Sequence, residues 1–143
     1  MRRLALLGCA VLMVGCAEKA PEADTMAAAM LSPADVAGTW TVNAMGETSD
    51  SVLVTYDVMA ADMTWTVTLP GRDPMTGQVQ FSGDSAVMTM GPFESVLRPG
   101  VQVTTTAVSR LVDGKLVGYT VAHYAGGGAD SVARLRTEGT RKQ

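Results

Sequence analysis

Residues 31–40, with the sequence LSPADVAGTW, decide how the fold of this chain is interpreted. Ser32 is a favoured helix N-cap residue, and Pro33 suits the first helical position. Gly38 ends this turn, and Trp40 follows two residues later in an extended segment. The stretch therefore predicts one short helical turn that leads directly into a first strand carrying a tryptophan.

The rest of the chain alternates apolar and polar residues with the period of two that is typical of strands with one wet face. In DMTWTVTL (62–69), Trp65 and Val67 fall on one face, and three threonines fall on the other. Thr and Val are stiff at the β-carbon and suit a pleated surface. The pattern predicts eight or nine strands, at about 38–45, 51–59, 62–69, 77–82, 85–90, 101–112, 115–124 and 130–140, with 93–97 as the ninth.

Turn signals separate these segments. Asp113-Gly114 lies between two alternating runs and is a strong hairpin signal, and Gly83-Asp84 occupies a similar position. Short connections favour antiparallel neighbours, so many strands with almost no helix indicate a barrel or a sandwich. The roughly 110 residues from 32 to 143 suffice for one domain with one core.

The tripeptide Gly38-Thr39-Trp40, preceded by a helical turn, resembles the signature of the lipocalins and the wider calycin group. The resemblance implies an all-β fold, a small antiparallel up-and-down β-barrel, with the tryptophan packed at its closed end. It also implies that a late arginine lies across this ring, and three are available: Arg134, Arg136 and Arg141. The family's second motif, a Thr-Asp-Tyr type of loop, is missing.

The N-terminal segment predicts export. Two arginines precede an apolar run that is too short to span a bilayer, as in a secretory signal. Met13-Val14-Gly15-Cys16 resembles the lipobox of bacterial lipoproteins, in which the cysteine is acylated and the signal is removed before it. The resemblance implies a signal peptide at 1–15, a lipidated Cys16 with a tether to residue 31, and a barrel domain at 32–143. An ordinary secretory signal with an incidental cysteine is the alternative.

The expected location is the outer membrane, because Ala17 rather than Asp follows the cysteine, as in exported lipoproteins of two-membraned bacteria. The expected partner is therefore the membrane, through the N-terminal lipid anchor. Residues 17–96 carry two basic and eleven acidic side chains, whereas residues 97–143 carry seven basic and three acidic ones. Either the two halves pair across the barrel, or a basic face meets an acidic ligand or anionic lipid. Basic residues are not interleaved with aromatic ones, so we expect no nucleic-acid partner.

Few residues could support catalysis or bind a metal. The chain has one histidine, His123, and lacks a Gly-x-Ser-x-Gly elbow. One histidine is too few for a typical zinc site, so we expect no enzyme activity, no metal and no cofactor. Met88 and Met90 share a strand face and could bind monovalent copper, but methionine more commonly fills core space.

The barrel interior is the remaining candidate site, for a lipid or another small hydrophobic molecule. The predicted ligand-binding residues are Trp40, Trp65 and Tyr119, with Arg134 or Arg136 contacting an anionic group. Solvent-facing arginines are the alternative. In 115–124, Gly118, Thr120 and Ala122 form a small face that would leave a cavity if it pointed inward. The second hypothesis is a packed barrel that acts as a structural or inhibitor-like interaction module through its 91–100 loop.

Overall fold

The computed structural model describes residues 29–143. The predicted signal peptide at 1–15, Cys16 and most of the 16–31 tether lie outside the described residues.

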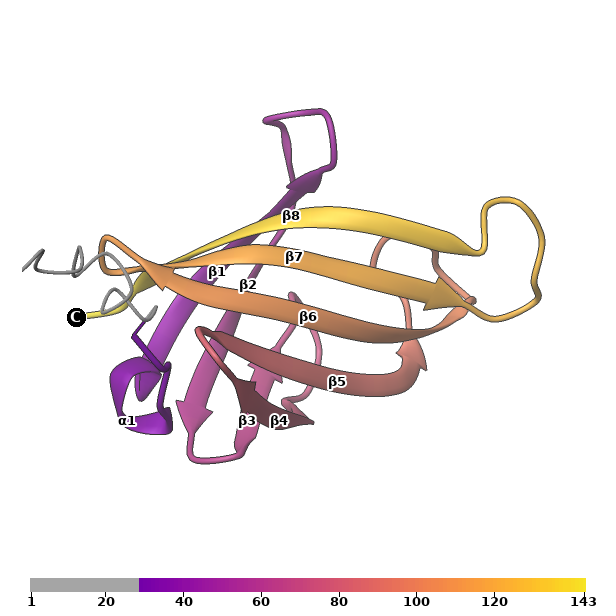
Figure 1. The fold of residues 1–143 in the computed structure, drawn as a ribbon. Helices are drawn as coiled ribbons and strands as arrows, with labels where there is room; N and C mark the ends of the chain where they lie inside the picture. Colours follow the sequence, from indigo (N-terminus) through magenta and orange to yellow (C-terminus); the bar gives the residue numbers. More distant parts are fainter. Residues whose placement is uncertain (1–28) are drawn as a thin grey trace, which may run out of the picture.

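The described chain forms a nearly all-β fold with one helix of a single turn (Figure 1). Within residues 29–143, no helix has the length and apolar character needed to cross a membrane. The elements are α1 (Pro33–Val36), β1 (Gly38–Gly46), β2 (Val52–Ala61), β3 (Thr64–Thr68), β4 (Met75–Ser82), β5 (Ser85–Glu94), β6 (Gln102–Val112), β7 (Lys115–Tyr124) and β8 (Val132–Arg141).

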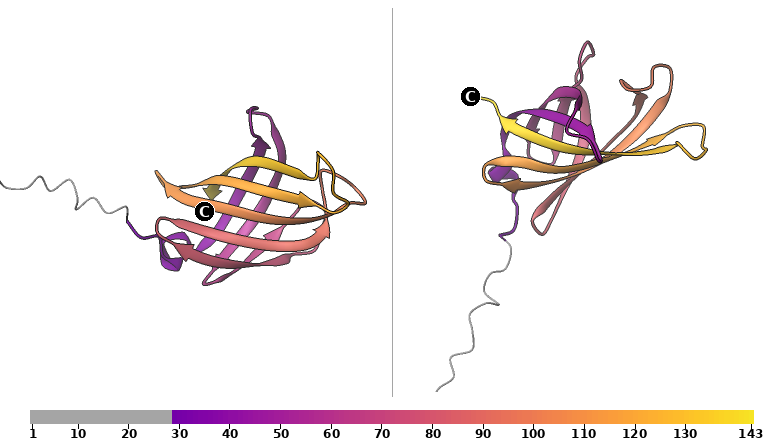
Figure 2. Two further views of the ribbon diagram at one scale, coloured as in Figure 1. Left: turned by 45° about the vertical axis from the view of Figure 1, so that its right-hand side comes forward. Right: turned by 90° about the horizontal axis from the view of Figure 1, so that it is seen from above.

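The eight strands form a closed antiparallel barrel in which each strand pairs with its neighbours in the sequence. The first and last strands close it: Trp40 on β1 pairs with Arg141 on β8, and Gly46 pairs with Leu135. In Figures 1 and 2, β6, β7 and β8 run side by side as long strands that extend toward the 125–131 connection. The sequence prediction of a small up-and-down barrel with a short helical turn is confirmed.

Trp40 and α1 cover one end of the barrel. Trp40 and Val36 are fully buried, and Trp40 Nε1 donates a hydrogen bond to the Val36 carbonyl at 2.8 Å. The Arg141 guanidinium lies 4.3 Å from the centre of the Trp40 ring. Arg141 also donates to the carbonyl oxygens of Ala37 and Asp35, so β8, α1 and β1 are joined at this end. Of the three candidate arginines, Arg141 is the one that lies across the tryptophan.

The predicted ninth strand at 93–97 does not form. Strand β5 instead continues to Glu94, with a register shift between Met90 and Phe93. Gly91, at φ 116°, and Pro92, which has no N–H to donate, account for this irregularity. The chain then turns at Ser95, whose Oγ accepts hydrogen bonds from the backbone N–H groups of Leu97 and Arg98. These bonds replace the ladder that a further strand would need.

Strands β6 and β7 approach each other unusually closely at Gly118. A β-carbon at this position would lie 1.8 Å from the Val108 carbonyl oxygen. Gly118 pairs with Ser109 in the ladder and has no positive φ, so close backbone approach is the reason that glycine is required here. The Asp113-Gly114 turn closes this same hairpin, as the sequence predicts.

Candidate functional site

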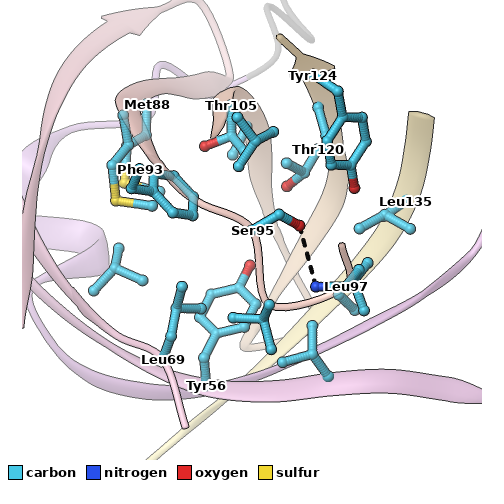
Figure 3. A pocket seen from close by; sticks show the side chains of 18 residues that line it. Tyr56, Leu69, Met88, Phe93, Ser95, Leu97, Thr105, Thr120, Tyr124 and Leu135 are labelled. Atoms are coloured by element: carbon cyan, nitrogen blue, oxygen red, sulfur yellow. Dashed lines mark hydrogen bonds between the residues drawn. The ribbon is translucent and has the colours of Figure 1, made fainter. Parts of the chain in front are cut away.

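The barrel encloses a cavity of about 80 Å³ toward the end opposite Trp40. Strands β1, β2, β3, β5, β6, β7 and β8 and the segment after β5 contribute side chains to its wall, and Figure 3 shows how the labelled ones point into it. Most of the wall is apolar, formed by residues such as Val67, Leu69, Met88, Phe93, Ala122 and Leu135. The cavity exists because small residues on β6 and β7, including Ala107 and Ala122, face inward.

Five of the side chains in this wall carry hydroxyl groups, including those of Thr105 and Tyr124 (Figure 3). The other three come from different elements. They belong to Tyr56 on β2, Thr120 on β7 and Ser95 in the turn after β5. Ser95 is buried, and its Oγ accepts hydrogen bonds from Leu97 N at 3.1 Å and Arg98 N at 3.0 Å. Thr120 Oγ1 is buried and has no hydrogen-bond partner within residues 29–143.

The interior strongly disfavours charge at Tyr56. Burial raises the pKa of the Tyr56 phenol to about 12, and the nearby Thr120 hydroxyl partly opposes this rise. Although the two hydroxyls lie near each other, Thr120 Oγ1 has no hydrogen-bond partner within residues 29–143. It can therefore still form a hydrogen bond with another group in the cavity. The site is thus an apolar pocket with a small number of neutral polar groups, the usual composition of small-molecule sites.

The turn after β5 forms part of the cavity mouth. Arg72 donates hydrogen bonds to the carbonyl oxygens of Glu94 and Ser95, which fixes the start of this turn. Arg98 lies 3.9 Å from the centre of the Tyr124 ring and donates to the Asp130 carbonyl at 2.6 Å. The 91–100 loop, predicted as an interaction loop in the second hypothesis, therefore directs Ser95 and its neighbours inward to the cavity.

Trp40 and Trp65 point into the barrel, but neither lines the main cavity. Trp40 closes the opposite end of the barrel, as described above. Trp65 packs edge-on to Phe81 and borders a separate cavity of about 20 Å³, which Ser109 and Thr137 also line. Among the described residues, Trp65 Nε1 is the other buried polar side-chain atom without a hydrogen-bond partner. The small cavity has room for about one water molecule.

Tyr119, Arg134 and Arg136 lie on the outer wall of the barrel. The Arg134 guanidinium stacks 4.0 Å from the centre of the Tyr119 ring. Arg136 forms an ion pair with Asp50 at 2.6 Å and donates to the Ser49 carbonyl. Of the five residues predicted to bind a ligand, Tyr119, Arg134 and Arg136 line one hollow of about 640 Å³ on this outer wall. Trp40 and Trp65 lie inside the barrel, so the five are not all brought together, and the arginines adopt the solvent-facing alternative. Successive residues of β8 point to opposite sides of the sheet. Leu135 and Thr137 point inward, so Arg134 and Arg136 point outward.

Ion pairs join the acidic and basic halves of the chain. Within the described residues, four ion pairs link a basic side chain after residue 97 to an acidic one before it: Arg110–Asp84, Arg134–Glu47, Arg136–Asp50 and Lys142–Asp57. The hydrogen bond from Lys142 is the main cause that lowers the pKa of Asp57. Of the two interpretations of the charge asymmetry, pairing between the halves is the one observed.

The residues considered for catalysis or metal binding do not lie together. His123 is exposed on the outer wall, at the end of β7. Met88 and Met90 are buried in the core and line the cavity, whereas Met63 is exposed in the turn between β2 and β3. Among residues 29–143, no three His, Cys, Asp or Glu side chains form a group that could hold a metal ion.

Sequence reasoning missed Tyr56 and Ser95 as cavity residues. A signal for Thr120 was present, since it belongs to the small face of 115–124 whose inward orientation implies a cavity. No protein-family model matches the chain, and no curated protein or solved structure is significantly similar to it.

Proposed function

We propose that this protein is an envelope lipoprotein whose barrel binds a small apolar or amphipathic molecule in the interior cavity. The observation that supports binding most directly is the apolar cavity of about 80 Å³ lined by Met88, Met90 and Thr120. Protein interiors are normally packed to the density of organic crystals, so a space of this size is a departure from the rule. Removing a methylene group from a packed core lowers the free energy of unfolding, so an unfilled space in the core is costly. This cost favours a functional role for the cavity.

The size of the cavity restricts the ligand. An engineered cavity of about 150 Å³ holds benzene, so the enclosed part of this site accepts a smaller apolar group. Leu97, which lines the cavity, is 38% exposed, so a longer molecule can extend past it toward solvent. The ligand class is a narrow molecule, such as a short acyl or alkyl chain.

The chain provides internal reporters for binding. Met88 and Met90 are buried and line the cavity, whereas Met59 and Met63 are about half exposed elsewhere. The experiment uses the whole expected mature chain, residues 16–143, carrying Cys16→Ser so that no detergent is needed. Its methionine methyl groups are labelled with carbon-13 and followed by NMR during titration with hexane.

Hexane is expected to shift the methyl signals of Met88 and Met90 in a saturable way and to leave those of Met59 and Met63 unchanged. Ala122→Leu, which fills the cavity, should abolish the shifts, whereas the matched change Val121→Leu on the outer wall should not. Equal shifts at all four methionines, or none at Met88 and Met90, would contradict the proposal.

Attachment to the membrane is proposed from Met13-Val14-Gly15-Cys16 and the segment before it. The expected modification is a diacylglycerol on the Cys16 thiol and an acyl chain on its amino group, which together exceed what stable anchoring requires. Mass spectrometry of the N-terminal peptide from membrane-extracted protein tests this. A peptide that begins at an unmodified Cys16, or earlier in the chain, would rule the anchor out.

A further inference from the structure

We infer that the cavity selects a neutral ligand with a hydrogen-bond acceptor, such as a carbonyl oxygen, held between the hydroxyl groups of Tyr56, Ser95 and Thr120. The inference rests on the proposed function and specifies the ligand of that same site. The apolar part of the molecule would lie along the wall formed by Val67, Met88 and Phe93.

Thr120 carries the inference. The residue is 9% exposed, and its Oγ1 atom is buried without a hydrogen-bond partner within residues 29–143. A buried hydroxyl left unpaired loses the hydrogen bonds that it made to water in the unfolded chain. A ligand that supplies the missing partner is therefore favoured over an alkane of the same size.

The hydroxyl groups near Thr120 indicate which kind of hydrogen-bonding group a ligand would supply. Ser95 Oγ already accepts two backbone N–H bonds, so its O–H is the group that remains to be used. Tyr56 and Thr120 also present O–H groups to the same space (Figure 3). Together with the Thr105 and Tyr124 hydroxyls of the same wall, these O–H groups suit an oxygen that accepts hydrogen bonds.

The composition of the cavity wall disfavours a charged ligand. Among the described residues that line the cavity, none has a charged side chain. A carboxylate placed there would be buried without a counter-ion, which is far costlier than burying a neutral carbonyl. Arg98 lies against the Tyr124 ring and is bound to the Asp130 carbonyl, and Arg72 is bound to the carbonyl oxygens of Glu94 and Ser95. The raised pKa of Tyr56 shows the same resistance of this interior to charge.

Three six-carbon probes separate the possibilities: hexan-2-one, hexane and hexanoate. Each is titrated into the Cys16→Ser chain at neutral pH, and its dissociation constant is taken from the Met88 and Met90 methyl shifts. One net hydrogen bond should make hexan-2-one bind about 3- to 10-fold more tightly than hexane. Hexanoate should bind more weakly than either neutral probe.

Thr120→Val tests the residue that carries the inference, because it replaces the hydroxyl with a methyl group of similar shape. It should reduce the affinity for hexan-2-one toward that for hexane, and leave hexane binding unchanged. Thr106→Val on the outer wall of β6 is the matched control and should alter neither. Thermal unfolding of each variant confirms that the barrel is intact, since removing an unpaired buried hydroxyl does not destabilise a fold.

The outcomes distinguish the two levels of the proposal. Saturable hexane binding with no preference for hexan-2-one, or a preference that survives in Thr120→Val, overturns the inference and leaves the binding function standing. Tighter binding of hexanoate also overturns it, and loss of that binding in Arg98→Ala would place the ligand's charge at the mouth. Failure of all three probes to shift the Met88 and Met90 signals counts against the binding function itself.

Discussion

At the scale of single residues, side-chain size determines where the interior is filled and where it is empty. Trp40 fills the end of the barrel near α1 and is fully buried. On β7, Thr120 and Ala122 face inward and leave space, which Tyr56 and Met88 only partly fill from the opposite strands. The cavity thus follows from the placement of small residues on a strand whose outer face is larger.

Tyr56 offers a test of this interior through its ionisation. Its pKa is raised to about 12 by burial, so between pH 10 and 12 the folded chain keeps a proton that the unfolded chain releases. Stability is therefore full below pH 10 and falls as the pH rises, by about 2 to 3 kcal/mol at pH 12. The phenolate absorbance should show a tyrosine step that is centred near pH 12.

Tyr56→Phe should remove the late step and the associated loss of stability, measured by urea unfolding at several pH values. Tyr119→Phe, on the outer wall, should leave both in place. Late titration that persists in Tyr56→Phe would show that another tyrosine produces this step, which contradicts the assignment to Tyr56.

At the scale of elements, the β6–β7 hairpin depends on close backbone contact. A β-carbon on Gly118 would lie 1.8 Å from the Val108 carbonyl oxygen, which backbone cannot accommodate without moving. Gly118→Ala should therefore cost about 1–3 kcal/mol or more of unfolding free energy, measured by urea denaturation. Gly46→Ala is the control, because its β-carbon would meet the nearest atom at 3.5 Å. Equal stability of the two variants would contradict the close approach.

The strands were largely predictable from the sequence because their alternation reflects one buried and one exposed face. The pattern in 62–69 predicts β3, although the observed strand is shorter because Asp62, at φ 49°, forms a turn with Met63. The 93–97 segment was predicted wrongly, since Ser95 uses its hydroxyl to turn the chain. Local polar bonds of this kind leave no periodic signal.

The candidate site was less predictable than the strands. A period of two places Arg134 and Arg136 on the same face of β8 but does not say which face is inside. The ladder with β1 and β7 fixes that phase, and Leu135 then points into the cavity. Tyr56 and Ser95 are 39 positions apart and meet only when the barrel closes. No local pattern contains that information.

At the scale of the whole molecule, closure of the sheet between β1 and β8 unites these features. It brings Arg141 over Trp40 at one end and leaves the cavity toward the other. It also pairs the acidic half of the chain with the basic half at exposed sites, where each ion pair contributes about 0–1 kcal/mol. The charged groups of the surface are thus engaged in pairs with one another, whereas the cavity lies in the apolar interior.

The central claim, that the barrel interior holds a small molecule, is tested most directly by what the protein retains when it is purified from the cells that make it. Mass spectrometry of solvent extracts should find one neutral compound, near one equivalent, with the unmodified chain and with Val121→Leu. The same compound should be missing from Ala122→Leu, in which the added side chain fills the cavity. Equal recovery from all three proteins, or from none, would contradict the account.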